Sequence, residues 1–410
     1  MGLCFAIFVG QGLYLVNWHT LVGDEVIHVV AGVLFWRTGV FEGGFDNPPL
    51  LQYLFGLPYE LGLSSYELLS TQLPTAARLV NLLFGVLLCA VIGVFSFKQH
   101  GKIGALLSVA LAGLSPSLVA HSSISTLDVG VAVFITAGFC SLYVGQKSPK
   151  SWLSGLAAFF FGLALVTKYT ALFCFPYVFL LVLGAHWISG RELKLVVTEL
   201  FLGAFIIWLC FSAAFFFEGV FSTEAKTGEG FFVRAATWFM PTKGLATIRG
   251  KIDQATTTKA TLHYFGEVRE SSPAFYVVIV FVKLLTGSLC LLIWLLVHCL
   301  LWDRDALGSW LYTVAPALSF WFFFLFNKTY CGIRHLLPVL ALLFVAMGAL
   351  GKYVNSKGRG KFLLALFLVI NLVDSAASFP SHMAYFNVLG RVLTDGPFVI
   401  GYCDTDYGQE

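Results

Sequence analysis

Apolar residues are grouped in long runs that recur from the first residues of the chain almost to its end. A helix that crosses a membrane needs about 20 mostly apolar residues. Several of the runs are short at one end, as expected of helices that stop partway to line a cavity. We predict eleven membrane-spanning helices near residues 2–17, 75–96, 103–120, 129–143, 152–166, 170–188, 195–217, 274–301, 309–326, 336–350 and 362–377.

The composition supports a membrane protein rather than a soluble one. Of the 410 residues, 58% are hydrophobic and 11% are charged, whereas a soluble domain averages about 25% charged residues. No soluble core could hide this much apolar surface, so lipid must be the solvent for most of it. The predicted fold class is an all-α polytopic membrane protein with a single membrane domain, residues 1–410. The first run lacks the basic start and the small-residue cleavage site of a signal peptide, so we expect it to be a spanning helix.

The basic residues predict the orientation of these helices. Most Lys and Arg residues of the short connections fall on one side of the predicted bundle, which the positive-inside rule makes cytoplasmic. The other side then carries a first outer loop (18–74), a long outer loop (218–273) and an outer C-terminal tail (378–410). ATP and nucleotide sugars do not reach an outward site, so a transferred group must come from an activated carrier on that side. Lipid-linked phosphates are the obvious class.

Four acids on the predicted outer side could carry chemistry. Asp24 and Glu25 follow the first apolar run, and adjacent residues of a helix point about 100° apart. Both are candidate catalytic residues: one can face a cavity while the other anchors the local structure, and we expect Asp24 to be the general base. The alternative is a polar helix start. Asp46 and Asp128 could together hold a divalent metal cation, unless Asp46 only marks a turn before Pro48 and Asp128 only caps a helix.

Cations at the same predicted boundary suggest a phosphate site. Each one alone is commonly a snorkelling anchor, but several beside carboxylates favour phosphate binding. Lys283 lies inside an apolar stretch, where a re-entrant first half would let it reach lipid headgroups. The candidate donor-phosphate residues are Arg78, Asn47, Lys168, Tyr169, Arg334 and His335.

The motifs together resemble a known family. They occur in the expected order over nearly all of the chain: Asp24-Glu25-Val26-Ile27-His28, Asp46-Asn47-Pro48-Pro49-Leu50, Arg78, Thr126-Leu127-Asp128, Thr167-Lys168-Tyr169-Thr170, His263-Tyr264-Phe265-Gly266, Gly332-Ile333-Arg334-His335-Leu336-Leu337-Pro338, Tyr385-Phe386-Asn387 and Asp404-Thr405-Asp406-Tyr407-Gly408-Gln409. This set resembles the protein O-mannosyltransferase and aminoarabinose-transferase (PMT-like) group of polyprenyl-phosphate-sugar-dependent enzymes, which have the GT-C membrane fold. The DEVIH sequence also looks faintly like a metalloprotease motif, but it lacks the first His, and we discount it.

The resemblance implies both a function and roles for residues. It implies an inverting glycosyltransferase in the cell membrane, which passes a sugar from a polyprenyl-phosphate donor to a hydroxyl of a protein, lipid or glycan acceptor on the extracytoplasmic side. Asp24 would be the base, Arg78 would support phosphate binding, and Asp46 and Asp128 would line the donor-phosphate site, with a bound cation in some relatives. Relatives usually have a basic residue or His where this chain has Asn47. Many relatives continue into an outer soluble domain, so acceptor recognition here is expected from the long outer loop, the tail or a partner.

Two other classes of function fit parts of the pattern. A transporter or lipid flippase would place its acids near the bilayer midplane and would show repeat symmetry. A non-catalytic assembly subunit would have no need of the acids. No nucleic-acid partner is indicated.

Overall fold

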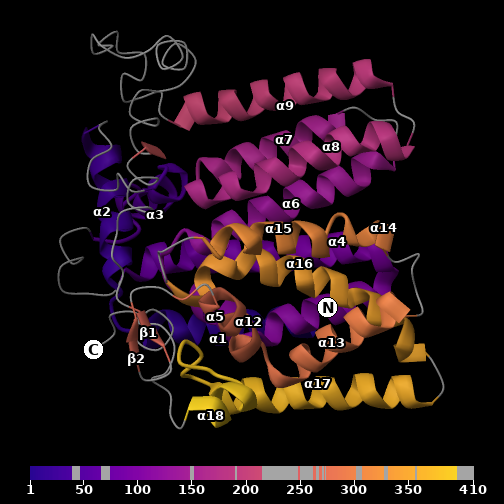
Figure 1. Cartoon of the computed structure of the whole chain (residues 1–410). Coiled ribbons are helices and arrows are strands. Elements are labelled where there is room, and N and C mark those ends of the chain that lie inside the picture. Colours follow the sequence, from indigo (N-terminus) through magenta and orange to yellow (C-terminus); the bar gives the residue numbers. More distant parts are fainter. Residues whose placement is uncertain are drawn as a thin grey trace.

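The computed structural model describes residues 1–38, 47–65, 74–147, 152–189, 192–214, 248–249, 262–264, 267–269, 272, 274–301, 307–326, 331–355 and 358–394. Most of these residues are helical, and long helices run side by side to form a bundle (Figure 1). Each of the eleven predicted spans contains helix, so the predicted all-α fold is confirmed. The described residues add one short hairpin, β1 (Leu262–Tyr264) and β2 (Glu267–Arg269), which pair antiparallel with Leu262 opposite Arg269.

The first helices turn sharply at one end of the bundle. The apolar α1 (Gly2–Trp18) is followed by α2 (Gly23–Thr38), which is bent by 92° relative to it. Asp24 and Glu25 occupy the first turn of α2, where the positive end of the helix dipole favours acids. Helix α3 (Leu50–Glu60) packs against α2, and both stand across the ends of the long helices at the left of Figure 1.

The contact between α2 and α3 is backbone against backbone. A Cβ atom at Gly32 would overlap the backbone oxygen of Gln52, and one at Gly56 would overlap the backbone of Gly32. The indole of Trp36 also donates to the backbone oxygen of Tyr53 over 2.7 Å. Only glycine allows this approach, so the two glycines fix where α2 lies relative to α3.

The middle of the chain supplies most of the bundle. Helix α4 (Thr75–Leu114) is interrupted at Gly101, whose φ of 72° is left-handed, so it contains the two predicted spans 75–96 and most of 103–120. The helices that follow are α5 (Pro116–Ser122), α6 (Asp128–Gln146), α7 (Trp152–Leu165), the 3-10 helix η2 (Tyr169–Cys174), α8 (Phe175–Ser189) and α9 (Leu193–Ala214).

The last part of the chain contains a second sharp bend. Helix α12 (Phe275–Lys283) is bent by 113° from α13 (Thr286–Leu301), so the predicted span 274–301 is broken next to Lys283. The remaining elements are α14 (Leu307–Trp310), α15 (Val314–Phe324), η5 (Gly332–Leu336), α16 (Leu337–Met347), η6 (Gly348–Asn355), α17 (Arg359–Ser378) and α18 (Val388–Thr394).

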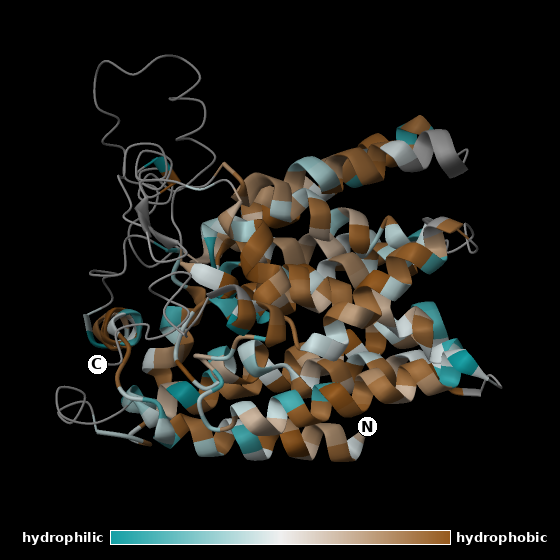
Figure 2. Ribbon diagram, turned by 60° about the horizontal axis from the view of Figure 1, so that its bottom comes forward, coloured by the Kyte–Doolittle hydropathy of each residue, from teal (hydrophilic) through white to brown (hydrophobic). Residues whose placement is uncertain are grey.

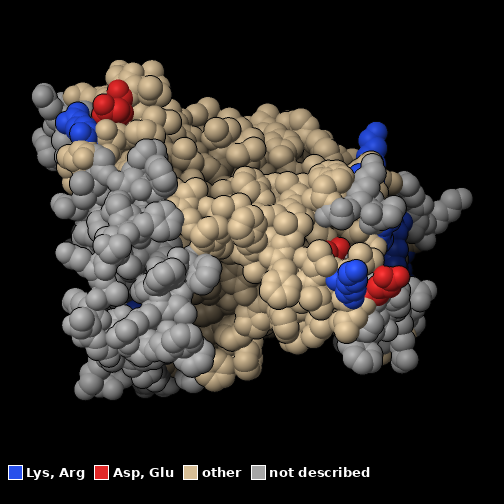
Figure 3. All heavy atoms as spheres, turned by 90° about the horizontal axis from the view of Figure 1, so that it is seen from above, with Lys and Arg blue, Asp and Glu red and all other residues tan. Residues whose placement is uncertain are grey.

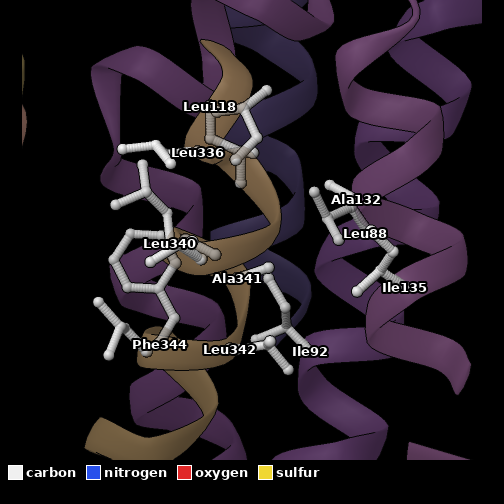
Figure 4. Close-up of a cluster of buried hydrophobic side chains, with 14 of the residues drawn as sticks. Leu88, Ile92, Leu118, Ala132, Ile135, Leu336, Leu340, Ala341, Leu342 and Phe344 are labelled. Carbon is white, nitrogen blue, oxygen red and sulfur yellow. The ribbon is translucent and has the colours of Figure 1, made fainter. Parts of the chain in front are cut away.

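The core lies around α16, all of whose residues are buried. Figure 4 shows Leu340 and Leu342 of this helix among side chains such as Leu88 and Ile92 of α4 and Ile135 of α6. At the periphery, by contrast, only 17% of the 18-residue apolar stretch of α9 is buried, and the same share of that of α17. An apolar helix that leaves its side chains uncovered is suited to lipid contact.

Length and composition mark five of the described helices as able to cross a membrane, or up to seven if each bent pair forms one span. Three shorter apolar helices accompany them. Hydrophobic residues cover the length of the helices, while hydrophilic ones gather toward both ends (Figure 2). The charged residues visible in Figure 3 likewise lie at opposite ends, with uncharged surface between them. The protein is therefore a multi-pass membrane protein.

Candidate active site

The predicted site residues that the structure describes come together at one end of the bundle. Asp24 lies in the first turn of α2, and Asp128 begins α6. Lys168 precedes η2, and Arg334 and His335 lie in η5. Four separate stretches of sequence therefore contribute to one region. Asp46 and the final 404–409 motif lie outside the described residues.

Asp24 and Arg334 form an ion pair. Nη1 of Arg334 donates to Oδ2 of Asp24 over 2.8 Å, although the two residues are 310 positions apart in the sequence. The side chain of Asp24 is 42% exposed, whereas that of Arg334 is 9% exposed. The carboxylate is thus held by a buried cation while much of its surface stays accessible.

Asp128 and Lys168 form a second, more deeply buried ion pair. Nζ of Lys168 donates to Oδ1 of Asp128 over 2.5 Å, and the two side chains are 11% and 2% exposed, respectively. Lys168 follows the end of α7 in extended backbone conformation. The backbone N–H of Leu50 donates to the backbone oxygen of Val166 over 3.1 Å, which brings the start of α3 beside Lys168. Asn47 lies three residues before Leu50, and its backbone oxygen accepts from Nε2 of Gln52.

His28 is close to both pairs. The four charged groups Asp24, Lys168, Asp128 and Arg334 all act electrostatically on its imidazole. The residue is 6% exposed, and its Nδ1 has no hydrogen-bond partner. Sequence reasoning had set this residue aside with the metalloprotease pattern. Its position four residues after Asp24, on the same face of a helix, was the signal that could have included it.

His121 connects the site with Lys283. Its buried imidazole is influenced by Asp128, Arg334 and Lys283. Lys283, at the last position of α12, donates to the backbone oxygen of Met383 over 2.9 Å. Its ammonium is 4.1 Å from the ring centroid of Phe386. The break between α12 and α13 thus brings a lysine from inside an apolar stretch to the site region.

Glu25 and Arg78 form a third pair, which is completely buried. Nε and Nη2 of Arg78 donate to the two carboxylate oxygens of Glu25 over 2.8 and 2.6 Å, and both side chains are 0% exposed. The guanidinium also donates to three backbone oxygens, those of Val16, His19 and Thr20, each over 2.7 Å. The carboxylate further accepts the backbone N–H groups of Val22 and Ser125.

All five N–H donors of the Arg78 guanidinium are therefore used inside the protein. The pair joins the end of α1, the start of α2 and the segment before α6. Burial is the main cause that raises the pKa of the neighbouring Tyr59 to about 12, and the charge of Glu25 adds to it. This geometry gives Arg78 and Glu25 a positioning function for α2 and leaves no Arg78 donor for a phosphate.

Tyr169 and His335 are packed among apolar and aromatic side chains. Tyr169 is 7% exposed and belongs to a cluster with Leu165 and Phe211. Nδ1 of His335 lies 3.2 Å from the hydroxyl of Tyr276, and its imidazole acts on the carboxylate of Asp128. His335 therefore adjoins the site, and Tyr169 packs in an apolar cluster directly after Lys168.

The described residues do not form a metal site. They contain no group of three or more His, Cys, Asp and Glu side chains suited to a metal ion. The carboxylate of Asp128 is occupied by an ammonium group, which is not a metal ligand. The prediction of a cation held by Asp46 and Asp128 stays untested, because Asp46 lies outside the described part of the chain.

Comparison with known proteins identifies the fold and the family resemblance. Residues 48–220 match the family model described as dolichyl-phosphate-mannose-protein mannosyltransferase (PMT). The chain is similar to the crystal structure of ArnT from Cupriavidus metallidurans bound to undecaprenyl phosphate, with a TM-score of 0.63 and 16% identity over 97% of this chain and 72% of ArnT. The predicted resemblance is confirmed. Over residues 48–220 the chain resembles the PMT family of glycosyltransferases, and the chain as a whole has the GT-C fold.

The oligosaccharyltransferase AglB from Archaeoglobus fulgidus is also similar. Its complex with an inhibitory peptide and a dolichol-phosphate gives a TM-score of 0.55 and 11% identity over 97% of this chain and 56% of AglB. Its complex with zinc and sulfate gives a TM-score of 0.54 and 14% identity, over 97% of this chain and 53% of the oligosaccharyltransferase. This PMT-like chain thus spans little more than half the length of AglB. No curated protein matches the chain.

Proposed function

We propose that this PMT-like glycosyltransferase moves a sugar from a polyprenyl-phosphate donor to a hydroxyl acceptor, with Asp24 as the general base. One observation carries the proposal. Among the three described acids of the site region, Asp24 is 42% exposed, whereas Asp128 is 2% and Glu25 is 0% exposed. A base must come within hydrogen-bond reach of the acceptor hydroxyl, and Asp24 alone of these three is accessible to it.

The proposed reaction is a single displacement. The acceptor oxygen attacks the anomeric carbon, the bond from that carbon to the phosphate oxygen breaks, and its electron pair leaves with the lipid phosphate. The acceptor proton passes to the carboxylate of Asp24. Attack from the face opposite the phosphate inverts the anomeric centre. The departing phosphate gains negative charge during this step, so cations next to it lower the barrier.

Lys168 and Arg334 are the cations proposed to hold the phosphate. Both belong to ion pairs of the site, and both act on the imidazole of His28 together with Asp24 and Asp128. Arg suits bidentate contact with a phosphate, and Lys supplies a point charge. The lipid phosphate bound by ArnT supports this class of donor. Asn47 and His335 would lie at the edge of the same site.

We place the site on the extracytoplasmic side of the cell membrane. The support is the predicted distribution of basic residues, which makes the opposite end of the helices cytoplasmic. The sugar enters with its lipid carrier from the outer leaflet. The acceptor is a hydroxyl of a protein, lipid or glycan.

Transfer assays with labelled polyprenyl-phosphate sugars and purified protein test the proposal. Asp24→Asn and Asp24→Ala should lower transfer by a factor of about 10² to 10⁴, the usual contribution of a general base. Glu60→Gln is the matched control, because Glu60 lies on α3 at the same end, is 42% exposed and is also paired with an arginine, Arg37. It should retain wild-type transfer. Full activity in Asp24→Ala would refute the role of Asp24.

The same assay separates transfer from transport. Release of free polyprenyl phosphate together with a glycosylated acceptor supports the transferase. Movement of intact donor across vesicles without such release would instead support a flippase.

A further inference from the structure

A cavity lies at the end of the bundle opposite Asp24 and Lys168. Its volume is about 860 Å³, and it lies between the break in α4, the end of α6, the segment around α14 and the 3-10 helix η6. Helix α6 begins at Asp128 in the active site and ends at Gln146 in the wall of this cavity. At 1.5 Å per residue the two regions are roughly 27 Å apart. The cavity is therefore separate from the active site.

The cavity is lined by cations. Lys102, Lys147 and Lys352 belong to its wall, and its lining residues in the described part of the chain include neither Asp nor Glu. The three lysines come from α4, from the residue after α6 and from η6, so the fold brings their charges together. A basic pocket between spanning helices attracts anionic lipid headgroups.

The wall also contains buried acceptor groups without a partner. Oε1 of Gln99 and Nε2 of His100 are buried and have no hydrogen-bond partner. The imidazole of His100 also bonds to the backbone of Val345, which leaves Nε2 as an acceptor when the ring is neutral. Hydroxyl groups would satisfy both atoms, and lysines would satisfy a phosphate. A ligand that suits both the lysines and these two acceptors is a phosphodiester that carries hydroxyl groups.

The surroundings of the cavity favour a lipid rather than a solute. Val94 and Phe97 lie on α4 within five residues of Gln99 and are 54% and 51% exposed, so the helix that lines the cavity also carries apolar surface suited to acyl chains. Tyr143 and Tyr312 line the cavity itself. Tyrosine is enriched where a bundle meets the headgroup layer.

We propose that this cavity binds the headgroup of an anionic glycerophospholipid, with a phosphate on the three lysines and headgroup hydroxyls on Gln99 and His100. The site is independent of the proposed transfer reaction, because none of its residues belongs to the active site. An inorganic phosphate could use the same lysines, but it would supply neither acyl chains nor a glycerol headgroup.

Binding to the purified full chain tests the proposal. Phosphatidylglycerol, phosphatidylcholine and inorganic phosphate are titrated separately, and bound lipid is counted by native mass spectrometry. Phosphatidylglycerol should bind in preference to the other two. The triple variant Lys102→Gln, Lys147→Gln, Lys352→Gln should lower its affinity on the order of a hundredfold, since each lysine near a headgroup contributes roughly fivefold.

A matched control removes the same charge from the same end of the protein. Lys98, Lys194 and Lys361 are exposed and lie outside the cavity, so the triple Gln variant at these positions should bind phosphatidylglycerol as the wild type does. Gly308 lines the cavity and has open space at its Cβ position. Gly308→Trp should therefore block binding with all charges intact, which keeps a test available if the triple lysine variant does not fold.

Three results would overturn the proposal. Equal losses in the cavity and control triples would mean that surface charge alone attracts the lipid. Unchanged binding in Gly308→Trp would place the lipid elsewhere. Inorganic phosphate that binds as tightly as phosphatidylglycerol would identify a soluble anion as the ligand.

Discussion

The buried pair of Arg78 and Glu25 gives the sharpest test of the structure. Sequence reasoning assigned Arg78 to the donor phosphate, whereas the structure uses all five of its N–H donors inside the protein, two on Glu25 and three on backbone oxygens. We therefore predict that Arg78→Leu and Arg78→Lys lower the stability of the protein. In properly folded protein neither should change the affinity for the donor.

The size of the effect follows from the geometry. Arg78→Leu leaves the carboxylate of Glu25 buried without its cation, and removing one partner of a buried pair costs about 3–5 kcal/mol. Arg78→Lys keeps the charge but has three donors for five acceptor contacts. At least two acceptors then lose their partner, at about 1–3 kcal/mol each. Both changes are large beside the total of about 5–15 kcal/mol that stabilises a typical domain.

The assay has two readouts. Thermal unfolding in detergent reports stability, and the KM for the polyprenyl-phosphate donor, measured well below the unfolding temperature, reports phosphate binding. Arg37→Lys is the control, since Arg37 forms a 3.8 Å exposed pair with Glu60 that is expected to contribute little. Wild-type stability in Arg78→Lys together with a raised donor KM would refute the positioning role and restore the phosphate role.

Two further predictions concern α2. Gly32→Leu should destabilise the protein by at least about 3 kcal/mol and reduce transfer, because the new side chain would overlap the backbone of Gln52. Thermal unfolding and transfer assays check this prediction. The control is Gly10→Leu, which should behave as the wild type does because the space around the Cβ position of Gly10 is open. Asp24→Asn should bind free polyprenyl phosphate more tightly than the wild type while it loses transfer, because it removes the anion that competes for Arg334; weaker lipid binding in a direct titration would contradict this.

The spans could be predicted because a membrane imposes a simple rule on the sequence. Every backbone group must be paired within lipid, so long apolar runs become helices. The break at Gly101 separates two predicted spans at a charged connection, as expected from its sequence. The bend beside Lys283 was expected only as one possibility for that stretch, because a lysine inside an apolar run can mark either a buried pair or a re-entrant segment.

The different surroundings of Asp24 and Glu25 followed from helix geometry. Neighbours on a helix point in directions about 100° apart, and the structure leaves Asp24 accessible and Glu25 buried. The partners of these acids could not be predicted. Arg334 is 310 residues from Asp24 in the sequence. Nothing in the sequence around Arg78 distinguishes it from other cations at a membrane boundary. The difference between the two arginines arises from tertiary packing, which places one beside a carboxylate that is still accessible and the other beneath the surface.

The ion pairs of the site bear on the order of events in the proposed reaction. Arg334 is paired with Asp24 and Lys168 with Asp128, so each cation is neutralised before a donor arrives. A lipid phosphate that enters this region competes with the carboxylates for the same two cations. Asp128 is buried and stays beside Lys168, whereas Asp24 is accessible and can turn toward an acceptor. A carboxylate that has given up its cation accepts a proton more readily. Donor binding would thus prepare the base, which is a reason for an enzyme to pair its general base with a phosphate-binding arginine.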